Sequence, residues 1–181
     1  PGQRQVTTFP VLDIGVHPEV EHEEWRLKIY GLVENPITLD WTQFMELEQF
    51  VDISDFHCVT TWSQFGMEWQ GVSFFTLTGL VKPKDEVSHV FYKGFDGYST
   101  NTPLDAVMDD DTLIAHTWNG APMPLEHGGP ARVIIPKLYA WKGAKWICRV
   151  EFTAEDQPGF WEKRGYSNSG DPWSNDRFSR L

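Results

Sequence analysis

The 181-residue chain lacks three features that would place it in familiar classes. It has no apolar run of about 18 residues, so the sequence predicts no transmembrane segment. It has only two cysteines, Cys58 and Cys148, which are too few for a disulfide scaffold. It has no excess of basic residues, since the formal net charge is −11, and this argues against a nucleic acid partner. No leader peptide is visible either, so we expect a cytoplasmic protein, or a periplasmic one if a leader has been removed.

Large aromatic side chains, in contrast, are abundant, with 9 Trp and 12 Phe. A chain of this length can bury a sizeable core, and such rings both fill cores and line pockets. Short strand and helix patterns are intermixed without regular βαβ alternation. This mixture favours an α+β fold with mostly antiparallel or mixed sheets and short helices.

Local patterns predict the individual elements of one domain spanning residues 1–181. Alternating apolar residues predict strands at 25–33, 37–39, 50–56, 87–93, 112–118, 132–135 and 145–152. Short helices are expected at 41–47, with a capping box between Asp40 and Gln43, at 74–81 after the cap Ser73, and from Pro103 onward. Asn119-Gly120 predicts a hairpin turn. Residues 155–181 mix turn formers with large rings, so we expect an irregular tail that wraps over the body.

Cys58 is the residue best suited to chemistry. His57 precedes it, and the hydroxyl residues Thr60, Thr61 and Ser63 follow it. In such a polar setting a cysteine can be a thiolate ligand of a soft metal or a nucleophile, whereas a cysteine at a strand end can equally be a packing residue. The residues alone leave these interpretations open.

Cys148 has a different setting. Its neighbours at even positions, Trp146, Val150 and Phe152, are apolar, which is the period-2 pattern of a half-buried strand. We therefore expect Cys148 to point into the core as an inert packing residue.

A cationic segment follows in the second half of the chain. Residues 127–150 contain no Asp or Glu but hold Arg132, Lys137, Lys142, Lys145 and Arg149. Lys142 and Lys145 flank Gly143 and Ala144, whose backbone N–H groups an anion can approach closely. The guanidinium of Arg132 is suited to a phosphate. A basic run is often a solvated face, but apolar neighbours surround these cations, and this favours a bound anion.

Four separated motifs resemble the molybdopterin-binding domain of the sulfite oxidase family. They are DFHCVTTWS (55–63), NGAPMP (119–124), HGGPARVIIP (127–136) and YAWKGAKW (139–146). The resemblance covers roughly residues 10–152, and residues 158–173 are similar to the tail of short, single-domain members. It implies the fold of that family and a molybdenum cofactor carried on a pterin.

The resemblance also implies roles for individual residues. Cys58 would hold the molybdenum, and Trp62 and His116 would face the metal pocket, so the expected catalytic residues are Cys58, Trp62 and His116. The stretch 7–11 is similar to a segment that crosses the cofactor. The expected cofactor-binding residues are Pro10, Val11, His57, Cys58, Thr60, His127, Arg132, Lys142, Gly143, Ala144 and Lys145.

Departures from the family pattern bear on the substrate. Sulfite oxidases carry arginines just after the ligand cysteine, where this chain has Trp62-Ser63-Gln64-Phe65, and their active-site tyrosine corresponds to His116. The Cys-Val-x-x-Trp-Ser pattern is closer to periplasmic methionine-sulfoxide reductase subunits, although those carry a threonine where Gly94 stands. We expect two-electron oxygen-atom transfer on a small molecule resembling a sulfoxide or N-oxide rather than sulfite. An unidentified electron donor or acceptor protein would be the partner.

Two other function classes stay open. A zinc-dependent hydrolase could use Cys58 with His57, His116 and His127, although their spacing matches none of the compact zinc patterns. A binding module without catalysis could use the aromatic tail as its interface.

Overall fold

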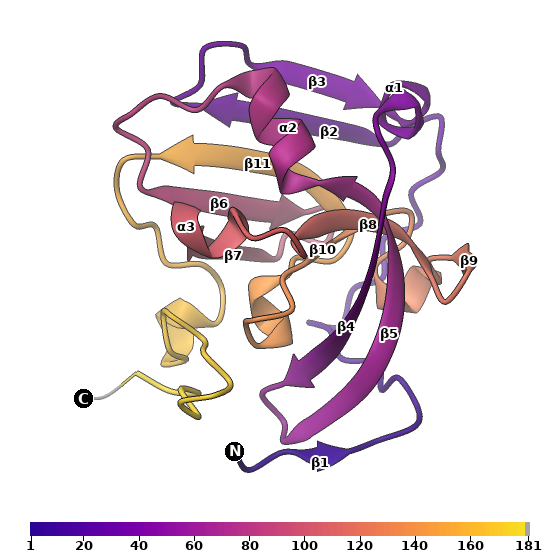
Figure 1. Cartoon of the computed structure of the whole chain (residues 1–181), viewed down its shortest axis with the longest axis vertical. Coiled ribbons are helices and arrows are strands. Elements are labelled where there is room, and N and C mark those ends of the chain that lie inside the picture. The colour runs from indigo at the N-terminus through magenta and orange to yellow at the C-terminus, as the bar shows by residue number, and fades with distance from the viewer. Residues whose placement is uncertain (180–181) are drawn as a thin grey trace.

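Two β-sheets form the body of the protein in the computed structural model, which describes residues 1–179 (Figure 1). The five-stranded sheet has the order β3 (Ile37–Asp40), β2 (Arg26–Gly31), β11 (Ile147–Thr153), β6 (His89–Gly94) and β7 (Ser99–Pro103). The six-stranded sheet contains β1 (Arg4–Gln5), β5 (Trp62–Ser73), β8 (Leu113–Trp118) and β10 (Arg132–Ile134), with β4 (Phe50–Cys58) paired to β5 and β9 (Ala121–Pro122) paired to β8. The pairs β11–β2 and β1–β5 are parallel and the other strand pairs are antiparallel, which confirms the predicted α+β class.

The helices are short and begin where the sequence predicts. They are α1 (Trp41–Glu46), α2 (Phe74–Val81) and α3 (Leu104–Val107), with 3-10 turns at Leu125–His127, Ala140–Lys142 and Glu162–Arg164. The side chain of Asp40 accepts from the backbone N–H of Gln43, and the side chain of Gln43 accepts from that of Asp40, so the capping box is confirmed. The hydroxyl of Ser73 caps α2 by accepting from the N–H of Thr76. None of the helices within residues 1–179 is long and apolar enough to cross a bilayer.

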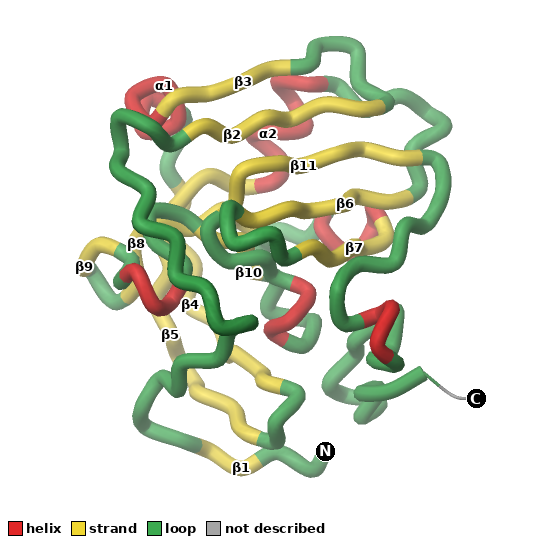
Figure 2. Tube along the Cα trace, turned by 180° about the vertical axis from the view of Figure 1, so that it is seen from behind, coloured by secondary structure: helices red, strands yellow, loops and turns green. Residues whose placement is uncertain are grey.

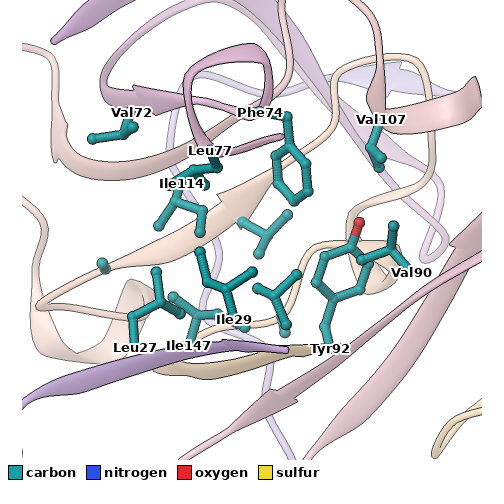
Figure 3. Packing of buried hydrophobic residues seen from close by; sticks show 14 of the residues in the cluster. Leu27, Ile29, Val72, Phe74, Leu77, Val90, Tyr92, Val107, Ile114 and Ile147 are labelled. Atoms are coloured by element: carbon teal, nitrogen blue, oxygen red, sulfur yellow. The ribbon is translucent and has the colours of Figure 1, made fainter. Parts of the chain in front are cut away.

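The larger core fills the space between the five-stranded sheet and α2. Figure 3 shows Phe74 and Leu77 of α2 lying across from Leu27 and Ile29 of β2. Because side chains alternate along a strand, burying Leu27 and Ile29 leaves Arg26 and Lys28 on the opposite face of the sheet. Figure 2 shows that outer face, seen from behind.

A second apolar cluster surrounds the end of the β4–β5 hairpin, and it includes Cys58, Trp62 and Phe56. The strand β5 was not predicted, although it is the longest in the sheet. Gly71 explains part of this, because β5 passes so close to β8 there that a Cβ would lie 2.0 Å from the Ile114 carbonyl oxygen. A glycine required by a close approach weakens the local strand pattern in the sequence.

The prediction for Cys148 was wrong. The register of β11 shifts between Ile147 and Arg149, and this β-bulge breaks the alternation of side chains. Ile147 and Val150 are buried, whereas Cys148 is partly exposed and donates its S–H to the Lys93 carbonyl at 3.2 Å.

The tail packs irregularly against the body, as expected, and a buried carboxylate fixes it there. Glu162 Oε1 accepts hydrogen bonds from Lys142 Nζ at 2.8 Å, Trp141 Nε1 at 3.0 Å and Thr100 Oγ1 at 2.9 Å. The side chains of Lys142 and Glu162 are 0% and 2% exposed. A buried ion pair is costly to break, because one charge is then left without compensation.

Replacing Glu162 therefore tests how the tail is held. Glu162→Gln should lower the free energy of unfolding by about 3–5 kcal/mol, because it strands the buried Lys142 ammonium. Glu34 and Lys82 form a matched exposed pair at 3.8 Å, with both side chains 61% exposed, and Glu34→Gln should cost less than about 1 kcal/mol. Chemical denaturation of both variants measures the difference, and equal losses would contradict the assignment.

Candidate functional site

Cys58 lies at a tight turn between β4 and β5. It is the last residue of β4 and pairs with Trp62, the first residue of β5. Thr61 adopts a positive φ of 71° and donates its N–H to the Cys58 carbonyl, which closes the turn. The Cys58 sulfur lies 3.2 Å from Thr60 Oγ1. The predicted loop is thus only the turn that joins the two strands.

Burial controls the protonation of this cysteine. Its side chain is almost enclosed, with 6% of the residue exposed. Burial raises the pKa of the Cys58 thiol, and the Thr60 hydroxyl and the charges of Arg132 and Arg177 oppose this only in part. A thiolate at this position therefore needs a further positive charge, such as that of a metal ion bound directly to the sulfur.

Both ends of the chain brace the Cys58 turn. The amide of Gln3 donates to the carbonyls of Cys58 at 3.0 Å and Trp62 at 2.7 Å. Arg177, near the other terminus, donates to the Val59 carbonyl and to Gln3 Oε1. Sequence reasoning missed both residues, because contacts across 55 to 174 positions leave no local pattern.

A cavity of about 340 Å³ opens beside the sulfur. It is lined by eight of the predicted site residues, namely Pro10, Cys58, Thr60, Trp62, His127, Arg132, Gly143 and Lys145. Phe9, from the stretch 7–11 that resembles a cofactor-crossing segment, also lines it. The sequence did not identify other lining residues, among them Asp13, Asp96, Tyr98, Trp161 and Tyr166. Trp161 and Tyr166 belong to the tail, so the tail forms one wall of the cavity.

Arg132 brings a positive charge to this cavity from the interior. It is 3% exposed and donates from Nη1 to the His127 carbonyl at 2.8 Å, and its guanidinium carbon lies 5.2 Å from the centre of the Phe56 ring. Burial lowers its pKa to about 10, which still leaves it charged at neutral pH. Its Nε is buried without a hydrogen-bond partner among residues 1–179.

His127 and Lys145 stand beside Arg132. The His127 ring stacks on Phe9 with 3.9 Å between ring centroids, and its Nδ1 is buried without a partner in the described part of the chain. Burial, together with the charges of Arg132 and Lys145, lowers the His127 pKa to about 4, so the ring is neutral at pH 7. Burial and the Arg132 charge lower the Lys145 pKa to about 8.

Gly128 allows these basic groups to lie so close together. Its φ is +111°, and a Cβ there would lie 3.0 Å from Lys145 Cβ and 3.1 Å from Arg132 Cβ. Gly143 has a similar role, because its Cβ would lie 2.3 Å from the Val133 carbonyl oxygen. Two neighbouring cations and two unpartnered buried nitrogens form a site that favours an anion with hydrogen-bonding groups.

Two predicted site residues have other roles in the fold. His116 does not reach the cavity, because the cavity side of β8 carries Leu113 and Ala115 whereas His116 packs against Phe44 and bonds to Gln49 Oε1 at 2.8 Å. Lys142 lies outside the cavity and is paired with Glu162, so it is not a free phosphate anchor.

Three further predicted residues also lie away from the cavity lining. His57 points to Ser63 Oγ at 2.7 Å and to the Trp173 ring, on the side of β4 opposite Cys58. Ala144 is buried in the larger core, and Val11 is 43% exposed. Among residues 1–179, no three His, Cys, Asp or Glu side chains form a group that could hold a metal ion, so the zinc interpretation has no built site there.

The low pKa of His127 predicts how stability depends on pH. Because the folded ring has a pKa of about 4 and the ordinary value is 6.5, the unfolded chain binds more protons between these values. Stability should therefore fall by about 1–3 kcal/mol as pH drops from 6.5 to 4, and His127→Gln should lose this part of the dependence. NMR titration of the histidine rings and chemical denaturation at several pH values measure both. A His127 pKa near 6.5 in the cofactor-free protein would contradict the assignment.

Comparisons with known proteins identify the family of the chain. The sequence model of the oxidoreductase molybdopterin-binding domain family matches residues 14–161. The chain is 41% identical to the uncharacterized oxidoreductase YuiH of Bacillus subtilis over 180 residues, which cover 99% of this chain and 91% of that protein. It is 27% identical to the protein-methionine-sulfoxide reductase catalytic subunit MsrP of Campylobacter jejuni over 165 residues, covering 82% of this chain but only 55% of that relative.

A solved structure shares the fold. The sulfane dehydrogenase SoxCD of Paracoccus pantotrophus matches with a TM-score of 0.70 and 24% identity, covering 82% of this chain and 42% of that one. At this identity the likeness shows the fold alone. Taken with the family match and the relatives, it leads to one conclusion: the chain belongs to the oxidoreductase molybdopterin-binding domain family, of the sulfite oxidase type.

Proposed function

We propose that the protein is a molybdenum-cofactor-dependent oxidoreductase in which the Cys58 sulfur is the protein ligand of the metal. One observation carries the proposal: Cys58, His127 and Arg132 line the same cavity, and His127 Nδ1 and Arg132 Nε are buried without a hydrogen-bond partner within residues 1–179. A soft thiolate suits molybdenum, and the two nitrogens suit a polar, anionic pterin.

The residues present fit the cofactor. The cofactor, when bound, supplies two-electron redox chemistry that no protein side chain provides. Arg132 and Lys145 would neutralise the phosphate of the pterin, and neutral His127 would hydrogen-bond to the pterin through Nδ1. Gly128 and Gly143 keep this part of the wall free of side chains. Burial of Cys58 favours a metal-bound thiolate over a free one, because a free thiolate would be an uncompensated charge.

The cavity favours a neutral oxide such as a sulfoxide or N-oxide as the substrate. The rings of Phe9, Phe56 and Trp62 line the cavity together with Cys58. Arg132, whose guanidinium lies over the Phe9 and Phe56 rings, is assigned to the pterin phosphate and not to the substrate. Reduction of a sulfoxide consumes two electrons and two protons and releases a sulfide and water. The relatives named as methionine-sulfoxide reductase subunits support this class of reaction.

Separate variants distinguish metal ligation from pterin anchoring. Cys58→Ser should abolish activity and lower bound molybdenum while keeping most of the pterin, because Arg132 and Lys145 remain. Cys148→Ser is the matched control at the other free cysteine, and it should keep both. Elemental analysis and the fluorescence of the released oxidised pterin measure occupancy. Full activity of Cys58→Ser would refute the ligand assignment.

Arg132→Ala should instead lower occupancy of the whole cofactor by about tenfold or more, because the loss of a charged hydrogen bond weakens binding by about 1.5–3 kcal/mol. Lys137→Ala changes an exposed cation of the same segment that pairs with Asp109, so it should leave occupancy unchanged. Elemental analysis and the fluorescence of the released oxidised pterin measure the occupancy of both variants. Wild-type pterin content in Arg132→Ala would show that the anchor lies elsewhere.

The substrate class is tested with the molybdenum-loaded protein. Reduction of methyl phenyl sulfoxide and trimethylamine N-oxide by a chemically reduced viologen should exceed sulfite oxidation in kcat/KM. The physical reason is the apolar lining formed by the rings of Phe9, Phe56 and Trp62, which disfavours a dianion. Efficient sulfite oxidation with a low KM would contradict the proposed substrate class.

A further inference from the structure

A row of positive charges crosses the outer face of the five-stranded sheet. Arg149 on β11 lies directly opposite Lys28 on β2 and directly opposite Lys93 on β6. Arg26 lies on the same face of β2, two residues before Lys28, and all four side chains are exposed. Like charges directly opposite each other in a sheet are destabilising. Such a row is unexpected in a chain with a net charge of −11.

The fold compensates this row only at its margins, where Asp40 lies opposite Arg26 and Glu151 follows Arg149 by two residues on the same face of β11. Within residues 1–179 none of the four cations forms a salt bridge with a carboxylate. Arg26 donates to the carbonyls of Glu23 and Trp25, and Lys28 lies 4.7 Å from the centre of the Tyr30 ring. The positive field is therefore available to a partner from outside.

The row borders a shallow, open depression of the surface. Arg26, Lys28, Lys93 and Arg149 share one cleft with Phe95, which is 39% exposed. No helix lies across β2, β11 and β6 on this side, as Figure 2 shows. A concave surface with one sign of charge focuses its field outward and attracts a partner of the opposite sign.

The cleft and the cofactor cavity share a wall. Gly94, the last residue of β6, and Phe95 line the cleft, whereas Asp96 in the turn that follows lines the cavity. The segment 146–148, at the start of β11, also borders both spaces, because Trp146 lines the cavity and Cys148 lines the cleft. A hydrogen bond of 2.9 Å from the Phe95 N–H to the Trp146 carbonyl joins the two segments. A protein bound in the cleft would thus be separated from the cavity by a thin layer of chain.

We propose that this cleft docks an acidic electron-carrier protein, a small flavoprotein or iron–sulfur protein with a negative surface. The proposal rests on the proposed function, because it identifies the partner that exchanges electrons with the same site. Charge complementarity would steer the carrier and orient it, and Phe95 would give it an apolar contact. An anionic membrane is disfavoured as the partner, because the remainder of the chain carries more negative charge than positive charge.

The electron balance requires repeated docking. One turnover on a sulfoxide consumes two electrons and two protons and yields the sulfide and water. A carrier that gives one electron, such as a flavodoxin hydroquinone oxidised to its semiquinone, must dock and leave twice per turnover. Electrostatic attraction at an exposed cleft suits such short contacts, because it raises the association rate more than the affinity.

The test reverses charge in the cleft and at a matched set elsewhere. The cleft variant is Lys28→Glu with Lys93→Glu and Arg149→Glu, and the control variant is Lys82→Glu with Lys84→Glu and Lys163→Glu, all at exposed positions. Both variants carry the same net charge. The probes are a reduced acidic flavodoxin and a reduced acidic plant-type ferredoxin, assayed for binding by fluorescence anisotropy and for kcat/KM in sulfoxide reduction.

We expect the cleft variant to lose about tenfold or more in kcat/KM and in binding of at least one carrier at low salt, whereas the control variant changes less than about threefold. Added salt should slow the wild type, because it screens attraction, but should not slow the cleft variant, in which it screens repulsion. Turnover driven by reduced viologen should be equal in all three proteins. The thermal unfolding midpoints of the cleft and control variants are compared as a check on folding, because the three glutamates of the cleft variant are again like charges opposite each other.

Several results would overturn the proposal. They are equal losses in both variants, no binding of either carrier to the wild type, or binding to vesicles of anionic lipid that only the cleft variant loses. Turnover driven by viologen tests the proposed function separately from the docking of a carrier protein. If the molybdenum-loaded wild type fails with viologen, the proposed function is wrong, and the binding measurements still decide whether acidic carriers use this cleft.

Discussion

Arg132 carries a guanidinium into the interior of the protein, and the site is arranged around that charge. Its hydrogen bond to the His127 carbonyl and its contact with the Phe56 ring compensate it only in part, and Nε is left without a partner among residues 1–179. The same charge lowers the pKa of His127 and of Lys145 and opposes the rise in the pKa of Cys58. A buried cation of this kind is stable only if an anion joins it. We therefore infer that the cavity beside Arg132 is completed by a bound anionic group.

The rest of the structure positions that charge and the sulfur relative to each other. Cys58 at the end of β4 and Arg132 at the start of β10 both line the cavity, and both strands belong to the six-stranded sheet. The larger core behind this sheet gives the rigidity that such a site needs. Glu162 holds the tail that closes a further wall, so chain ends far apart in sequence complete the enclosure.

Local sequence rules predicted local structure well. The capping box at Asp40, the cap at Ser73 and the Asn119-Gly120 turn depend on hydrogen bonds between neighbouring residues, and a short window of sequence contains them. Cys58 and Arg132 were recognised as residues of one site through the family resemblance, and the structure places both at the cavity.

What could not be predicted depends on tertiary register. The face on which His116 lies is set by how β8 pairs with β5, and a register shift between Gln70 and Gly71 intervenes there. A bulge turns Cys148 away from the core, and Lys142 forms a buried ion pair with Glu162, twenty positions later in the chain.

The sulfur environment of molybdenum, measured by X-ray absorption at the metal edge, tests the central claim most directly. The account predicts that Cys58→Ser removes one sulfur neighbour from the metal, whereas an unchanged sulfur shell in a metal-loaded Cys58→Ser protein would contradict it.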